Sequence, residues 1–125
     1  MALLGFVFQG EDHGIIFQIF DELVANGRAR EALDGGIDPS PVVKLYIPGA
    51  GAIWLLSEIS PYDPDLAFGL CDLGMGFPEL GYVSLCELEG VRGHFNMLVE
   101  RDFDFRADKP LSAYLQAARE GKEYA

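Results

Sequence analysis

Few side chains in this sequence are of the types that carry out nucleophilic catalysis. The chain contains two histidines, His13 and His94, and two cysteines, Cys71 and Cys86. Nucleophilic catalysis needs a nucleophile, a base and a group that orients the base. Both cysteines have apolar neighbours, a setting typical of buried and unreactive thiols in a reducing cytosol. We therefore predict no disulfide framework and no Cys/His enzyme.

Metal and phosphate sites also lack their usual sequence patterns. Asp63 and Asp65 lie two residues apart in a predicted loop, but no EF-hand-like pattern surrounds them. The glycine turns at 49–51 and 74–76 lack both the Lys-Ser/Thr of a phosphate loop and the spacing of a dinucleotide fingerprint. We predict no metal, no cofactor and no catalytic residue. An uncharacterised enzyme stays a distant third hypothesis, because carboxylate pairs form in space and leave no pattern in sequence.

Acidic residues dominate the charge of the chain. Twenty acids against nine Lys and Arg give a formal net charge of −11. Binding to nucleic acid or to an anionic membrane depends on a basic surface, so we predict neither. Ten of the acids lie between residues 51 and 104, where only Arg92 and Arg101 oppose them. This distribution favours either a well-solvated surface or a negative face for a basic partner.

Length and composition predict one domain over residues 1–125. Half of the residues are apolar, so a core can form without disulfides. No stretch approaches the roughly 18 consecutive apolar residues of a membrane-spanning helix. The N-terminal apolar run lacks a preceding basic residue and a cleavage site, so we expect a cytoplasmic protein without a secretory signal.

Residues 1–24 fit two interpretations. In the first, 3–9 and 15–20 are two strands of a hairpin. In the second, which we favour, 15–25 is a helix with one buried face, and Asn26-Gly27 ends it. Arg28–Leu33 would then form a separate short turn.

Strand patterns follow in the middle of the chain. The predicted strands are Val42–Ile47, Ala52–Ile59, Leu66–Leu73, Leu80–Val83 and Met97–Phe105. In the second of these, alternation places Ile53, Leu55 and Ile59 on one face and Trp54, Leu56 and Glu58 on the other.

Two helix-start signals complete the pattern. Ser84 and Glu87 match a capping box that starts a short helix, and Asp108 with Pro110 opens the last one. Together these elements predict an α+β fold, in which an antiparallel sheet of four to five strands has two or three helices packed on one face.

The last predicted strand suggests an interaction surface. Its alternation turns Glu100, Asp102 and Asp104 outward, about 6.8 Å apart, while double-stranded DNA presents a phosphate about every 3.4 Å on each strand. With further acids beside it, this row would imitate part of a phosphate ribbon. The other interpretation is a solvated edge strand whose charges prevent aggregation.

Trp54, the only tryptophan, also fits two interpretations. It is either a core residue or an anchor for a partner, since aromatic residues dominate binding hot spots.

Several segments carry a resemblance to a known family. They are Ala25-Asn26-Gly27-Arg28, PVVKLYIPGAGAIWLLSEI (41–59), PDLAFGLCDLGMGFPELGYVSLCELEGVRG (64–93), ERDFDF (100–105) and KPLSAYLQAAREG (109–121). The chain resembles the bacterial family called domain of unknown function 2958 over roughly Ala25 to Gly121, most specifically from Phe68 to Ser84. The resemblance implies a small, single-domain, cytoplasmic protein that is often encoded on plasmids and other mobile elements. It supplies no activity and no catalytic residue.

These observations favour an interaction protein without enzymatic activity. We predict that the chain binds a protein partner with a basic surface. This partner would belong to a nucleic-acid-processing or defence complex, and the chain would bind it by imitating DNA. The alternative is a regulatory or scaffold module that acts through the sheet face of Trp54 or as a homodimer. The predicted protein-binding residues are Trp54, Glu58, Asp72, Glu79, Glu87, Glu100, Asp102 and Asp104.

Overall fold

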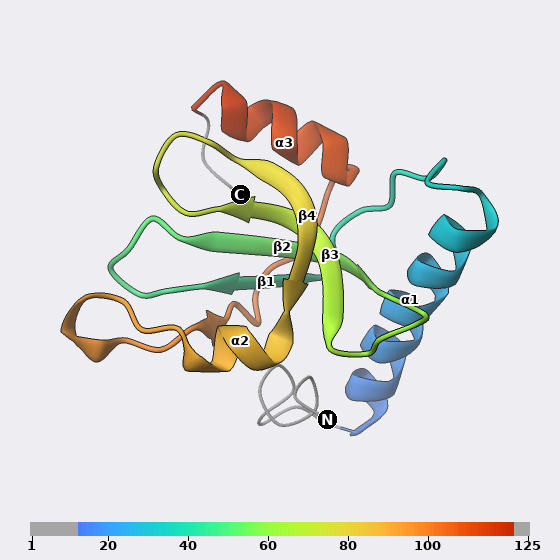
Figure 1. Ribbon diagram of the computed structural model, residues 1–125, viewed down its shortest axis with the longest axis horizontal. Helices are drawn as coiled ribbons and strands as arrows, with labels where there is room; N and C mark the ends of the chain where they lie inside the picture. Colours follow the sequence, from blue (N-terminus) through green and yellow to red (C-terminus); the bar gives the residue numbers. More distant parts are fainter. Residues whose placement is uncertain (1–12, 122–125) are drawn as a thin grey trace.

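A long helix precedes a four-stranded meander, and two short helices and a short strand follow it. The computed structural model describes residues 13–121. Its elements are α1 (His13–Ala32), β1 (Val43–Tyr46), β2 (Ile53–Ile59), β3 (Leu66–Asp72), β4 (Glu79–Ser84), α2 (Leu85–Gly90), the 3-10 helix η2 (His94–Asn96), β5 (Glu100–Arg101) and α3 (Leu111–Arg119). All strand pairs are antiparallel, in the order β4-β3-β2-β1-β5. The predicted α+β class and antiparallel sheet are confirmed (Figure 1).

The helices cover both faces of the sheet rather than one. Leu23 of α1 and Leu85 of α2 pack with Trp54 in one apolar cluster. Leu111 of α3 packs with Leu55 in a second cluster on the opposite face. Strand β2 carries apolar side chains on both of its faces. A single layer of helices would leave the side chains of one face exposed to water. Figure 1 shows α1 and α3 at different sides of the sheet.

A β-bulge in β2 corrects the predicted alternation of this strand. The pairing of β2 with β3 shifts between Leu56 and Glu58, so Ser57 is the extra residue. After the bulge, Ile59 joins the cluster of Trp54. Glu58 lies opposite Phe68, which packs on the α3 side. The prediction that grouped Ile59 with Leu55, and Glu58 with Trp54, is therefore wrong.

Helix α1 continues through Asn26-Gly27, where the sequence predicted its end. Both residues instead bring the helix close to β2. The Asn26 amide donates to the carbonyl of Ser57 over 2.8 Å. A Cβ on Gly27 would lie 1.8 Å from the carbonyl oxygen of Ile59, so only glycine fits there. The helix stops later, where Gly35 has a left-handed φ of 82° and its amide donates to the carbonyl of Arg30.

The two predicted helix starts have different outcomes. The cap at Ser84 is confirmed, because its hydroxyl accepts from the amide of Glu87 over 3.1 Å. The cap at Asp108 is wrong, since Asp38 accepts from the amide of Ser112 over 3.0 Å instead. Asp108 accepts from the Tyr114 hydroxyl, which, together with the neighbouring Lys109, lowers the pKa of its carboxyl group.

The predicted strand Met97–Phe105 is also wrong over most of its length. Only Glu100 and Arg101 pair with β1, which is itself just four residues long. At Asp102 the chain turns, because this carboxylate accepts from the amide of Asp104 over 3.0 Å. The outward row Glu100, Asp102 and Asp104 therefore does not form along a single extended strand.

We predict that Gly27→Ala destabilises the protein by about 2 kcal/mol or more, because the added methyl group forces α1 away from β2. An alanine usually stabilises a helix interior by about 1 kcal/mol relative to glycine, so the sign of the change is diagnostic. Gly90→Ala, at the end of α2 with no atom near its would-be Cβ, is the matched control. Urea unfolding measures both, and a Gly27→Ala variant as stable as the control contradicts the close crossing.

Candidate protein-binding surface

Two of the predicted binding residues lie in the interior. Trp54 is only 3% exposed and packs in the cluster beneath α1 and α2. Of its two interpretations, the structure supports the core residue. Because helices cover both faces of the sheet, the face of Trp54 is closed to a partner.

Glu58 is buried as well, at 1% exposure, and forms an ion pair within the fold. Its Oε2 lies 2.6 Å from Nε of Arg30, and its Oε1 accepts from the hydroxyl of Ser57. The guanidinium of Arg30 stacks 4.2 Å from the ring centre of Phe68. A buried carboxylate needs such partners to offset its desolvation. Glu58 therefore links α1 to β2 and does not face a partner.

We predict that Arg30→Met destabilises the protein by about 3 kcal/mol, at the low end for a broken buried pair, because its side chain keeps some solvent contact at 19% exposure. The double variant Arg30→Met/Glu58→Met recovers most of this loss, because it also removes the buried carboxylate of Glu58, which Arg30→Met leaves without its ion-pair partner. Arg28→Met, an exposed arginine on the same helix, is the control. Equal instability of the single and double variants in urea would contradict a structural ion pair.

Four of the remaining predicted acids lie toward opposite sides of the sheet. Asp72 ends β3 and Glu79 begins the edge strand β4. Glu100 lies on β5, at the opposite edge. Asp102 is 3.5 Å from the ammonium of Lys44. The structure thus separates these groups by the width of the sheet and brings no continuous row together.

Glu87 and Asp104 complete the set. Glu87 is exposed in the first turn of α2, and Asp104 is exposed in the turn after β5.

Three loops meet at one end of the sheet, between these two edges. They are the β1–β2 turn, the β3–β4 loop and the segment from Arg92 to Val99, all at the left of Figure 1. The backbones of Gly51 and Gly74 touch, since a Cβ on either would lie about 3.0 to 3.1 Å from the other's Cα. Gly93 packs on the side chain of Ile47 in the same way. The β1–β2 turn therefore contacts both of the other loops, and the three together form the surface at this end of the molecule.

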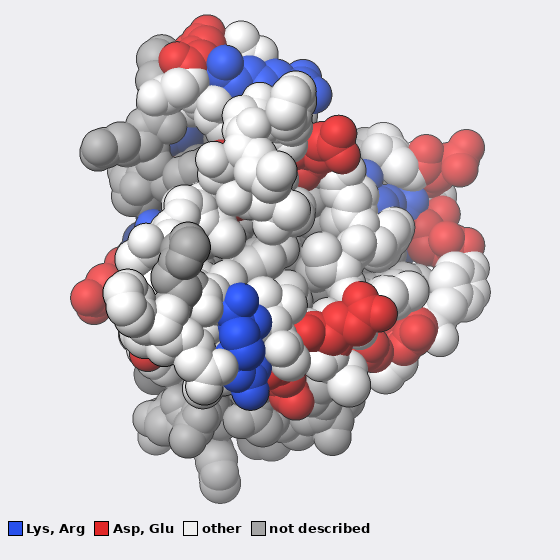
Figure 2. Space-filling model, turned by 60° about the vertical axis from the view of Figure 1, so that its left-hand side comes forward, with Lys and Arg blue, Asp and Glu red and all other residues white. Residues whose placement is uncertain are grey.

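This surface exposes large apolar side chains. We call it the loop-end surface and define it by Leu73, Met75, Phe77, Phe95, Met97 and Leu98. Phe77 is 79% exposed and Phe95 98%. Figure 2 turns this end of the molecule toward the viewer, with many uncharged side chains over the face and both acidic and basic groups among and around them. Large exposed apolar patches with polar rims mark interaction sites.

The backbone at Phe95 is strained. Its φ of 57° and ψ of 27° are left-handed, and Asn96 follows with φ 61°. Asparagine tolerates this region, but for a bulky residue it costs about 1–2 kcal/mol. Burial does not offset this cost, because the phenyl ring is almost wholly exposed. Residues held in sparsely populated backbone conformations are concentrated at functional sites.

Sequence reasoning missed the loop-end surface. The glycines at 74–76 are typical of a turn, and the sequence alone does not show that the side chains between them are exposed. The available signal was that Leu73, Met75 and Phe77 are apolar and alternate with glycines, in a segment where turns are usually polar. An exposed loop with this composition has no folding reason to be apolar.

The side chains that the structure describes were compared with the geometry of a metal site. Among those described side chains, no group of three or more His, Cys, Asp or Glu lies close enough to hold a metal ion. Cys71 is half-buried, and burial raises the pKa of its thiol. Cys86 is exposed, which corrects the prediction that both thiols are buried.

We predict that 5,5′-dithiobis(2-nitrobenzoate) at about pH 8 labels Cys86 fast and Cys71 slowly, since a raised pKa leaves less reactive thiolate. Cys86→Ser then removes the fast phase alone. Equal rates for both thiols would contradict the difference in their surroundings.

The fold and this surface define a small α+β domain with an exposed apolar end. The chain belongs to the family described as protein of unknown function (DUF2958), whose family model matches residues 15–123. The match confirms the resemblance and extends it to the first turns of α1, ahead of the predicted start at Ala25. No curated protein and no solved structure matches the chain. No helix within residues 13–121 is long and apolar enough to cross a membrane.

Proposed function

We propose that the protein is a non-enzymatic binding module that recognises another protein through the loop-end surface. The observation that carries this proposal is the set of apolar side chains exposed on adjoining loops, with Phe95 held in a strained backbone. Phe77 and Phe95 would act as the anchors, because a few large aromatic residues supply most of the energy of an interface. Leu73, Met75 and Leu98 would complete its apolar centre.

The charges at the margin indicate the character of the partner. Asp72 and Glu79 lie beside the β3–β4 loop, and Glu100 lies at the end of the Arg92–Val99 segment. An apolar centre with a charged rim is the usual anatomy of a protein interface. Acidic groups at the rim speed association with a basic partner and repel nucleic acid and anionic lipid. We therefore propose a protein partner with a basic surface around an apolar recess.

DNA mimicry stays a prediction, as do a partner in a nucleic-acid-processing or defence complex and an origin on a mobile element. Mimicry depends on acids spaced along a ribbon, whereas the loop-end surface depends on apolar contact. The two versions differ in their response to salt, which screens charges but strengthens apolar burial.

We expect Phe95→Ser to weaken partner binding at least tenfold, because truncation of a central aromatic anchor costs about 2 kcal/mol or more. Stability should hold, since the ring is exposed. Partners captured from a lysate of the source organism with the natural chain, and lost with Phe95→Ser and Phe77→Ser, would be purified and their affinities measured. Leu33→Ser, an exposed apolar residue at the other end of the molecule, is the matched control. Equal loss with Leu33→Ser would contradict a specific surface.

We expect the captured partner to remain bound in about 0.5 M salt, where the Debye length is only a few ångströms. Release at this salt concentration, with Phe95→Ser without effect, would reject the loop-end surface and favour the electrostatic version.

The loop-end surface also fits a second copy of the chain, in keeping with the homodimer alternative. We expect a monomer in size-exclusion chromatography with light scattering, because like acidic rims repel each other in a symmetric pair. A dimer that Phe95→Ser converts to a monomer would identify the second copy as the partner.

A further inference from the structure

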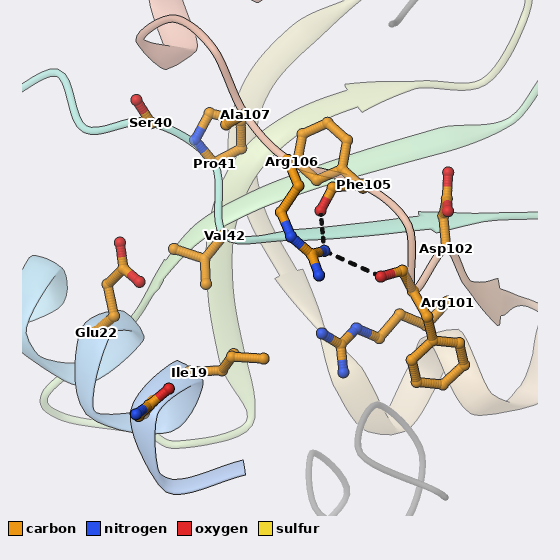
Figure 3. Close-up of a pocket in the computed structure, with 12 residues that line it drawn as sticks. Ile19, Glu22, Ser40, Pro41, Val42, Arg101, Asp102, Phe105, Arg106 and Ala107 are labelled. Carbon is orange, nitrogen blue, oxygen red and sulfur yellow. Dashed lines mark hydrogen bonds between the residues drawn. The ribbon is translucent and has the colours of Figure 1, made fainter. Parts of the chain in front are cut away.

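The two edges of the sheet differ in how they are protected. At one edge, β5 is only two residues long, and the amide of Asp102 then donates to the carbonyl of Lys44 on β1 over 3.0 Å. Arg106 donates from Nη1 to the carbonyls of Phe103 and Phe105, over 3.0 and 2.8 Å, and so holds the turn that follows β5 (Figure 3). Short strands and turned backbone protect an edge from pairing with another chain.

The β4 edge lacks these devices in the part of the chain that the structure describes. Strand β4 is six residues long, and its pairing with β3 runs without a register shift. No strand among the described residues pairs with its outer side. Lysine and proline, which commonly blunt an edge, are absent from residues 79–84. The outer side of β4 is therefore open to an added strand.

One hydrogen bond fixes which backbone groups of β4 face this open side. The amide of Leu85 donates to the carbonyl of Asp65 over 2.9 Å, directly beyond the last registered pair of β3 and β4. Hydrogen-bonded and non-hydrogen-bonded pairs alternate along an antiparallel ladder. Counting back from Leu85 in steps of two, the odd-numbered residues of β4 turn their N–H and C=O groups toward β3. Leu80 and Tyr82 therefore direct theirs to the open side.

Leu80 and Tyr82 also have exposed side chains. Because they are two residues apart in a strand, both side chains lie on the same face of the sheet. The ring of Tyr82 packs against Phe68, with 5.1 Å between ring centres, and Phe68 belongs to the cluster on the α3 side. An added strand would cover Leu80 and Tyr82 with its own side chains, in cross-strand pairs.

Acidic residues lie at both ends of β4. Glu79 begins the strand, and Glu87 is exposed in the first turn of α2, which follows it. Basic residues at the ends of an added strand would complement these charges. The strand also begins two residues after Phe77. The β4 edge is therefore continuous with the loop-end surface.

We propose that the partner adds an extended segment to β4 as a sixth, antiparallel strand of the sheet. Hydrogen bonds to the outward backbone groups of Leu80 and Tyr82 hold this segment, apolar side chains cover the same two residues, and basic residues lie near Glu79 and Glu87. The inference rests on the proposed function, because it assigns the conformation of part of the partner that the loop-end surface recognises.

The peptide Lys-Thr-Val-Thr-Val-Lys, acetylated and amidated at its ends, is the probe for this strand. In antiparallel register its two valines lie opposite Tyr82 and Leu80, and its last lysine lies opposite Glu79. We expect saturable shifts centred on the backbone amides of Leu80 and Tyr82 in two-dimensional NMR titrations. No saturable shift, or shifts centred elsewhere, would overturn the proposal.

Two N-methylated forms of the peptide have the same composition and differ only in the edge that they block. Methyl groups on the third and fifth residues replace amide hydrogens that face β4, so binding should weaken at least about tenfold through the loss of two hydrogen bonds. Methyl groups on the second and fourth residues face away from β4 and should change binding less than about twofold. Equal affinity of the two forms would overturn the strand geometry.

Leu80→Pro tests the same geometry from the side of the protein. Proline lacks an amide donor, and at an outward position of an edge strand it leaves the ladder with β3 intact. Peptide binding should fall at least several-fold further than in Leu80→Ala, which keeps the donor and removes only the side chain. Equal losses in the two variants would contradict the backbone bond. If Leu80→Pro fails to fold, the two methylated peptides decide the question.

Failure of this inference differs from failure of the proposed function. A purified partner that Phe95→Ser weakens and Leu80→Pro does not would reject strand addition and support the loop-end surface. A partner that Leu80→Pro weakens and Phe95→Ser does not would support strand addition at β4 and reject the loop-end surface as the anchor.

Discussion

The close crossing of α1 over β2 is the constraint on which the rest of this fold depends. At Gly27 the helix backbone reaches the carbonyl of Ile59, a distance that no side chain permits. The bulge at Ser57 supplies the carbonyl that Asn26 binds and turns Glu58 toward Arg30. One irregular residue in β2 thus creates both polar links between the helix and the sheet. With α1 fixed in this position, one face of the sheet closes over Trp54.

Local patterns predicted the elements of this structure better than their arrangement. The strands of the meander and the cap at Ser84 follow from alternation, turns and capping, which depend on neighbours in sequence. The end of α1 was mispredicted because Asn26-Gly27 is typical of a helix stop, whereas here tertiary contact with β2 overrides it. Asp108 was mistaken for a cap because the true cap, Asp38, lies 74 residues before Ser112. Capping rules consider only residues next to the helix start, so they do not detect a cap that is so distant in sequence.

The candidate site was less predictable than the fold for a related reason. Charge is visible in composition, so the acids were predicted to form the binding surface. Their positions in space, however, depend on which strands become edges. Glu58 was assigned to the wrong face because a bulge shifts the phase of a strand without leaving a signature. The apolar residues of the 73–77 loop and Phe95 were visible in the sequence. Their exposure was not, because it follows from three loops meeting at one end of the sheet.

The distant cap of α3 has a consequence for the order in which the chain folds. A helix of nine residues is too short to persist alone in water. Its first turn is held by Asp38 and by the carbonyl of Pro39, which accepts from the amide of Leu111. Its apolar side needs Leu55 and Leu70 of the assembled sheet. During synthesis on a ribosome, the last helix therefore forms only after the meander has formed. Until this helix docks, the Leu55 face of the sheet stays accessible to chaperones and proteases.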